Sequence, residues 1–145
     1  MKKINKKTIL IVILLLTFSY VFSQLKVPVK YIKIEYIDFT VLTDVDIYCD
    51  TFEQGLSYNT ILIKDVRSIE KFMCDFYKAQ KDTIKDYHLD VRCKIIVFYN
   101  KNQIDTICLS RFGYCYNNSV VFKDDKFIDF VGRFIRERDN HFVYK

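Results

Sequence analysis

Two apolar runs around a short polar segment constrain the fold of this chain more than any other feature. Residues 91–99 read VRCKIIVFY, residues 100–103 read NKNQ, and residues 104–109 read IDTICL. Such runs around an Asn-rich and Lys-rich turn predict an antiparallel β-hairpin. The first run is apolar on both faces, whereas an antiparallel strand with one solvated face alternates cleanly. Two arrangements would cover both faces: two helices on different faces, or a bent sheet that folds over itself. The alternative is an apolar strip that stays exposed for a partner or a homodimer.

Two registers are open to this hairpin, and both keep Cys93 and Cys108 on one face. A turn centred on residues 100–101 sets the two cysteines directly opposite each other. A turn centred on residues 101–102, or a four-residue loop, sets Cys108 opposite Ile95 and pairs more apolar residues in the centre, so we favour it. The β-carbons of the cysteines then lie about 7–8 Å apart, too far for a disulfide. We therefore expect two neighbouring, unbridged thiols that fill the core.

The whole chain predicts a small α+β domain with the element order β-β-β-α-β-β-β-α. Besides the hairpin, apolar or alternating runs predict strands at residues 29–40, 45–49 and 60–64 and from residue 120. Residues 113–118 predict a turn. Helices are expected after Asp65 and after Asp124 or Asp125, because a carboxylate can accept from the free amides of a first turn and apolar residues then recur at helical spacing. Neighbouring strands favour a mainly antiparallel sheet with one or two helices packed on it.

The first 23 residues predict a cleavable signal peptide. Four lysines and no acid precede an apolar run of about 15 residues, and Ser23 precedes Gln24. A helix needs roughly 20 apolar residues to span a bilayer, and the order is typical of secretory signals. The Lys-rich start and the Ser-Gln junction resemble the signals of exported bacterial proteins. We expect cleavage after Ser23, export to the periplasm, cell envelope or extracellular space, and a single domain over residues 24–145; the alternative is an uncleaved membrane anchor.

The charge distribution argues against a nucleic-acid-binding protein. The chain has 23 Lys and Arg against 18 Asp and Glu, a formal +5, and residues 1–23 hold four of the lysines and no acid, which leaves 19 against 18 in the remainder. A nucleic-acid groove gathers several cations on one surface. We expect no nucleic-acid partner, and contact with a membrane only through residues 1–23 if they are retained.

No motif in the sequence predicts catalysis. Five cysteines are present, namely Cys49, Cys74, Cys93, Cys108 and Cys115. They form no CxxC pair of a zinc or redox site, and their odd number leaves at least one thiol unpaired in an exported chain. His88 and His141 lie in no signature of a cysteine hydrolase, and the three glycines form no phosphate-binding loop. We therefore expect no metal and no cofactor.

An aromatic segment supplies the candidate binding residues. Residues 111–118 place aromatic side chains around the predicted turn, and aromatic residues are over-represented in interface hot spots. The candidates are Phe112, Tyr114 and Tyr116. A partner site here requires that at least one of the two tyrosines be substantially exposed.

Two short motifs concern glycosylation. The tripeptide Asp82-Thr83-Ile84 resembles the Asp-Thr-aliphatic acceptor of one bacterial O-glycosylation system, which implies modification of Thr83. Residues 117–119 match the N-glycosylation acceptor, but a hairpin turn explains them better.

By elimination, the sequence favours a noncatalytic exported domain that binds another protein in the cell envelope, as an inhibitor or an immunity protein does. The alternatives are a small enzyme without a recognisable motif and an envelope component that associates with itself. A concave pocket with convergent polar groups, above all a histidine beside a cysteine, would favour the enzyme. A flat apolar strip without a pocket would favour binding.

Overall fold

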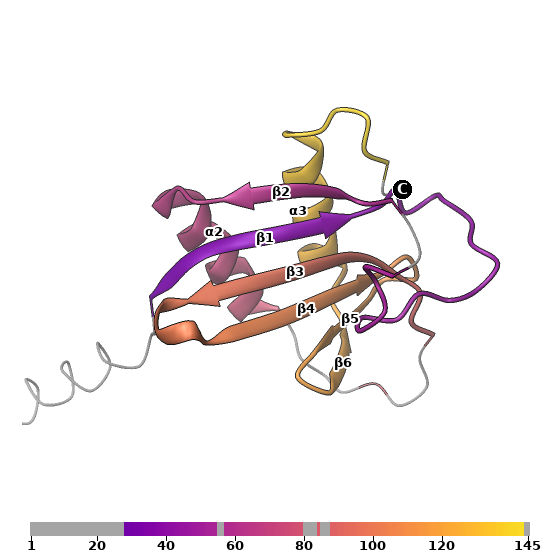
Figure 1. The fold of residues 1–145 in the computed structure, drawn as a ribbon, viewed down its shortest axis with the longest axis horizontal. Helices are drawn as coiled ribbons and strands as arrows, with labels where there is room; N and C mark the ends of the chain where they lie inside the picture. Colours follow the sequence, from indigo (N-terminus) through magenta and orange to yellow (C-terminus); the bar gives the residue numbers. More distant parts are fainter. Residues whose placement is uncertain (1–27, 55–56, 80–83, 85–87, 144–145) are drawn as a thin grey trace, which may run out of the picture.

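A six-stranded antiparallel sheet carries two helices on one face (Figure 1). The computed structural model describes residues 28–54, 57–79, 84 and 88–143. The elements are β1 (Val29–Tyr36), β2 (Asn59–Ile63), α2 (Val66–Lys78), β3 (Val91–Tyr99), the short 3-10 turn η1 (Asn100–Asn102), β4 (Ile104–Ser110), β5 (Tyr114–Asn117), β6 (Val120–Lys123) and α3 (Asp125–Arg136). The strands lie in the order β2-β1-β3-β4-β5-β6. This confirms the α+β class and corrects the predicted order to β-β-α-β-β-β-β-α.

Both helices begin at the predicted capping carboxylates. The Asp65 side chain accepts from the backbone N–H of Ser68 at 2.8 Å, and that of Asp124 from Phe127 at 2.9 Å. Their apolar stripes pack against the inner face of the sheet and form one continuous core with it. Because both helices lie on this face, neither predicted way of covering both faces is correct, and none of the described helices lies on the outer face.

The β3–β4 hairpin adopts neither predicted register. The connection through η1 sets Phe98 opposite Ile104, one residue away from both alternatives. A shift of one residue turns a strand's side chains to the other face. Cys108 therefore lies opposite Lys94 on the outer face, while Cys93 is buried in the inner core. The prediction that the two cysteines share a face is wrong. The prediction that both are unbridged thiols is also wrong: they are not bonded to each other, but Cys108 forms a disulfide with Cys49, and of the two Cys93 is the free thiol.

The strand predicted at residues 45–49 does not form, and the first strand ends at Tyr36 rather than at residue 40. The alternating residues serve another purpose: Ile47 and Cys49 pack against the outer face of the sheet. The backbone N–H of Ile47 donates to a carboxylate instead of a neighbouring strand.

The predicted turn at residues 113–118 is mostly a strand. β5 pairs with β4 on one side and with β6 on the other. The turn between β5 and β6 falls on Asn118 and Ser119, whose φ angles are 48° and 65°. The interpretation of residues 117–119 as a hairpin turn is thus confirmed.

Candidate interaction loop

The 22 residues between β1 and β2, residues 37–58, form the most unusual connection of the fold, which we call the anchored loop. None of its described residues lies in a helix or strand. Connections of this length without regular structure are uncommon in compact domains and are usually functional or disordered. In Figure 1 the loop leaves the sheet at the end of β1, on the right of the view. A disulfide and an ion pair hold it against the sheet.

A disulfide joins the anchored loop to the sheet. Cys49 is bonded to Cys108 on the outer face of β4, with the Cα atoms 5.8 Å apart. Phe52, which is 2% exposed, and Val91 pack around it as a second, smaller core. This core covers one end of the outer face, so the middle of the loop cannot lift away without exposing apolar surface.

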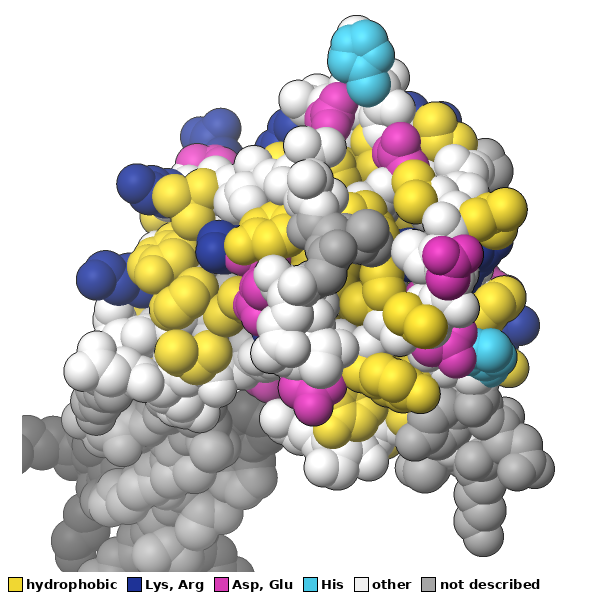
Figure 2. Space-filling view, turned by 45° about the vertical axis from the view of Figure 1, so that its right-hand side comes forward, with side chains coloured by type: hydrophobic (Ala, Val, Ile, Leu, Met, Phe, Trp, Pro, Cys, Tyr) yellow, Lys and Arg dark blue, Asp and Glu magenta, His cyan; other side chains and the backbone are white. Residues whose placement is uncertain are grey.

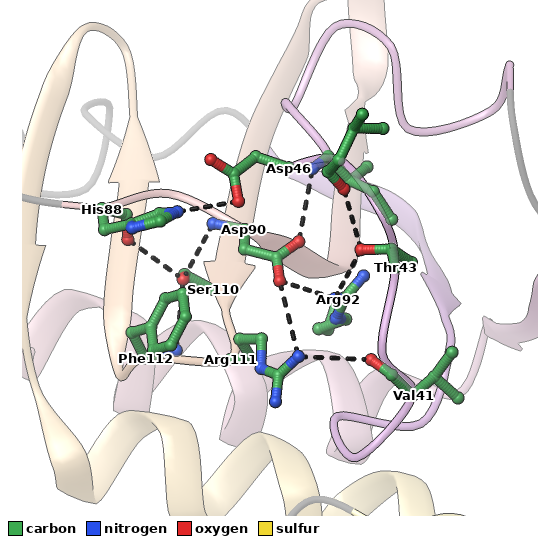
Figure 3. A network of polar contacts seen from close by, with 11 residues as sticks. Val41, Thr43, Asp46, His88, Asp90, Arg92, Ser110, Arg111 and Phe112 are labelled. Carbon is green, nitrogen blue, oxygen red and sulfur yellow. Dashed lines mark hydrogen bonds and ion pairs between the residues drawn. The ribbon is translucent and has the colours of Figure 1, made fainter.

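A buried ion pair holds the first half of the loop (Figure 3). Asp90 and Arg92 flank the start of β3, and the Arg92 side chain is fully buried. Its Nη2 donates to Asp90 at 2.5 Å and to the Thr43 hydroxyl at 3.0 Å. Arg111 lies 3.8 Å from the same carboxylate and donates to the Val41 carbonyl at 3.4 Å. Burial lowers the pKa of the Arg92 guanidinium, and Asp90 opposes that shift.

The anchored loop nevertheless turns apolar side chains to solvent. We call these four residues the loop patch: Val41 (40% exposed), Leu42 (80%), Val45 (74%) and Tyr48 (55%). In Figure 2, hydrophobic and acidic side chains alternate over the right-hand part of the surface. A backbone fixed by a disulfide and a buried ion pair loses little further freedom on binding. The four exposed side chains of the loop patch therefore stand on a backbone that is fixed in place.

The predicted binding residue Phe112 borders this loop. Its side chain is 47% exposed, and its ring centroid lies 4.8 Å from that of His88. His88 in turn places Nε2 2.7 Å from a carboxylate oxygen of Asp46 in the loop. The structure thus brings Phe112 to the edge of the loop patch, although the two segments are far apart in the sequence.

The two predicted tyrosines lie apart from Phe112, on the outer face of β5. Tyr114 and Tyr116 are each partly exposed. Tyr116 lines a hollow of about 470 Å³ between the loop and the sheet, together with Tyr48, Asp50 and Lys94. The role of these three aromatic residues in binding stays a prediction. Thr83 and the predicted signal peptide lie outside the described residues.

Three residues of the types found in catalytic triads lie near the loop, namely Ser110, His88 and Asp90, but the Ser110 hydroxyl contacts their backbone groups and not their side chains. The buried Ser110 hydroxyl accepts from the backbone N–H groups of Asp90 and Phe112, each at 3.2 Å, and donates to the carbonyl of His88 at 3.4 Å, not to its ring. A nucleophile needs contact with the side chain of a base. Burial also raises the pKa of the Cys93 and Cys115 thiols, which keeps them protonated.

Other parts of the described chain offer weaker sites. A groove of about 590 Å³ runs between α2 and the start of β1; it is lined mainly by apolar side chains, with Glu70 and Lys78 as its charged residues. In the described residues, no three His, Cys, Asp or Glu side chains gather as metal ligands would. The same residues include no helix with the length and hydropathy of a membrane span.

Comparison with known proteins finds no matching family model, no matching curated protein and no matching solved structure.

The anchored loop was not predicted as a site, because the alternation of Ile47 and Cys49 with polar residues predicts a strand. A usable signal was present in its composition: residues 37–58 hold five acidic residues and no Lys or Arg. The Asp90–Arg92 pair carries no such signal, because its contact with the loop, through Thr43, joins residues that are 49 positions apart in the sequence.

Proposed function

We propose that the protein is an exported, noncatalytic binding domain whose anchored loop engages another protein of the cell envelope, as an inhibitor or an immunity protein does. The observation that carries the proposal is the loop patch on a fixed backbone. Leu42 and Val45 are more exposed than any other large hydrophobic side chains of the described residues.

The energetics favour a binding role over a merely structural one. Fully burying a Val or Leu side chain gains about 1.5–3 kcal/mol. The loop covers part of the sheet, yet it leaves Leu42 and Val45 exposed and so does not obtain this stabilisation from them. Exposed apolar side chains that gather on one surface are typical of sites that contact another protein. The disulfide supports export, because such bonds form and persist in oxidising compartments.

The capture of partners by matched variants tests this role. The mature domain, immobilised, is exposed to an envelope extract of its own cells, beside Leu42→Asp/Val45→Asp and the control Val66→Asp/Ile104→Asp. The control residues are 66% and 56% exposed and lie on α2 and β4, away from the loop. We expect a protein retained by the wild type and the control, and retained at least about tenfold more weakly by the loop variant, since the loss of hot-spot contacts costs 2 kcal/mol or more.

The outcomes separate the proposal from its alternatives. If the loop variant retains every partner as the wild type does, the loop is not the binding surface. If the domain retains only further copies of itself, and loses them in the loop variant, the loop serves self-association instead.

A further inference from the structure

The anchored loop has a uniform charge. Residues 37–58 include Asp38, Asp44, Asp46, Asp50 and Glu53, and no Lys, Arg or His. The part of the chain after residue 23 as a whole is nearly balanced, with 19 basic against 18 acidic residues. The loop therefore concentrates negative charge on one segment of an almost neutral domain.

Three of these five carboxylates have partners within the fold. Asp38 accepts from the backbone N–H of Val143 at 2.9 Å, Asp46 pairs with His88, and Glu53 accepts from Lys94 at 2.8 Å. These three acids help to hold the loop in place.

The two others, Asp44 and Asp50, are exposed and have no hydrogen bond or ion pair to another described residue. Asp44 lies between Leu42 and Val45 of the loop patch, and Asp50 lines the hollow beside Tyr48. Unpaired carboxylates are thus interleaved with the exposed apolar side chains.

The cations closest to the loop do not neutralise these carboxylates. Arg92 is fully buried, and Arg111 is 23% exposed and directed toward Asp90 and the Val41 carbonyl. Lys94 of the hollow is only 12% exposed and pairs with Glu53. The surface that a partner would meet is therefore both apolar and negatively charged.

We propose that the partner of the loop is a protein surface that carries Lys or Arg side chains beside apolar ones. This inference rests on the proposed binding function. An acidic or neutral partner would bury Asp44 and Asp50 without compensation, and like charges brought together across an interface cost several kcal/mol. A basic partner pairs with them and is also attracted from a distance. The described carboxylates do not gather into a group that could hold a metal ion.

A library of short random peptides displayed on phage, without charge bias, is the probe. Peptides are selected on the disulfide-intact mature domain, and their affinities are measured for the wild type, for Asp44→Asn/Asp50→Asn and for the control Glu70→Gln/Asp75→Asn. The control removes the same charge from α2. We expect enriched peptides with a net positive charge next to aromatic or Leu residues. The loop neutralisation should weaken them roughly tenfold, the effect of two ion pairs, and added salt should do the same by screening. The control should change the affinity less than twofold.

The variant Leu42→Asp/Val45→Asp separates failure of this inference from failure of the proposed function. The inference of a basic partner would be wrong if the selected peptides lose affinity for this variant but are neutral or acidic and bind the wild type independently of salt. The proposed binding function would then still hold. Peptides that bind this variant as well as the wild type would overturn the binding function itself.

Discussion

At the scale of single residues, Arg92 has an unusual position. Its side chain is fully buried, yet only Nη2 has hydrogen-bond partners; Nε and Nη1 have none among the described residues. Removing a guanidinium from water costs several kcal/mol, and a single carboxylate offsets this only in part. The benefit is that the pair positions the loop. The Arg92 guanidinium donates to Thr43 and, together with Arg111, surrounds Asp90. The Asp90 carboxylate in turn accepts from the backbone N–H of Ile47.

The buried Asp90–Arg92 pair leads to a prediction about the free energy of unfolding. Arg92→Met should lower the free energy of unfolding by about 2–4 kcal/mol, because it leaves the buried Asp90 without its main partner. Asp90→Asn/Arg92→Met should lose less than the sum of the two single variants, because the charge that needs compensation is gone. Urea unfolding measures all of them.

The control for this double-mutant cycle is Arg133→Met on the exposed side of α3, where Nε donates to the Asp129 carbonyl at 3.3 Å. It should change the free energy by less than about 0.5 kcal/mol. Additive losses in the double variant would show that Asp90 and Arg92 do not stabilise each other.

At the scale of elements, the fold separates two kinds of segment. The helices and the inner sides of the strands follow local rules: capping carboxylates, helical spacing and alternation. The anchored loop follows none of them, because a disulfide and a few long-range contacts hold it in place. Its conformation depends on the sheet that it covers.

Removing the disulfide should therefore affect the loop first. Cys49→Ser/Cys108→Ser removes a link across 59 residues and should cost about 2–4 kcal/mol of stability. Hydrogen exchange should accelerate over residues 38–53 while α2 and α3 stay protected, because local opening precedes global unfolding. Cys74→Ser, which removes an exposed free cysteine, is the control and should change neither measurement. A uniform acceleration over the whole domain would contradict the view of the loop as a separately anchored element.

The same division explains what the sequence could predict. The caps at Asp65 and Asp124 and the turn at residues 117–119 were predicted correctly because neighbouring residues determine them. The hairpin register was wrong because the 3-10 turn spans three residues, 100–102, whereas both predicted connections had an even number of residues, two or four. The anchored loop was missed because its partners, Cys108 and Asp90, are distant in sequence.

At the scale of the whole molecule, the two faces of the sheet have different roles. The helices and the inner face form the main core. The outer face is covered at one end by the loop and leaves apolar side chains partly exposed at the other, where Tyr31 and Phe98 stack at 4.3 Å. The predicted apolar strip thus exists in part, whereas the loop patch holds the two most exposed large hydrophobic side chains of the described residues, Leu42 and Val45.

The disulfide that fixes the loop forms and persists in an oxidising environment, which is what the proposed export would provide. In cells that encode the protein, the mature chain should begin at Gln24, lose the four lysines of the signal and carry the Cys49–Cys108 link. Leu14→Arg/Leu15→Arg interrupts the apolar run, so the precursor should stay inside the cell with both thiols reduced. The matched control Leu62→Arg alters an exposed residue of β2 and should leave export intact. N-terminal sequencing and mass mapping of unreduced peptides decide the question: a membrane-bound chain that begins at Met1 would establish the uncleaved anchor, and an oxidised loop in the retained variant would break the link between export and the disulfide.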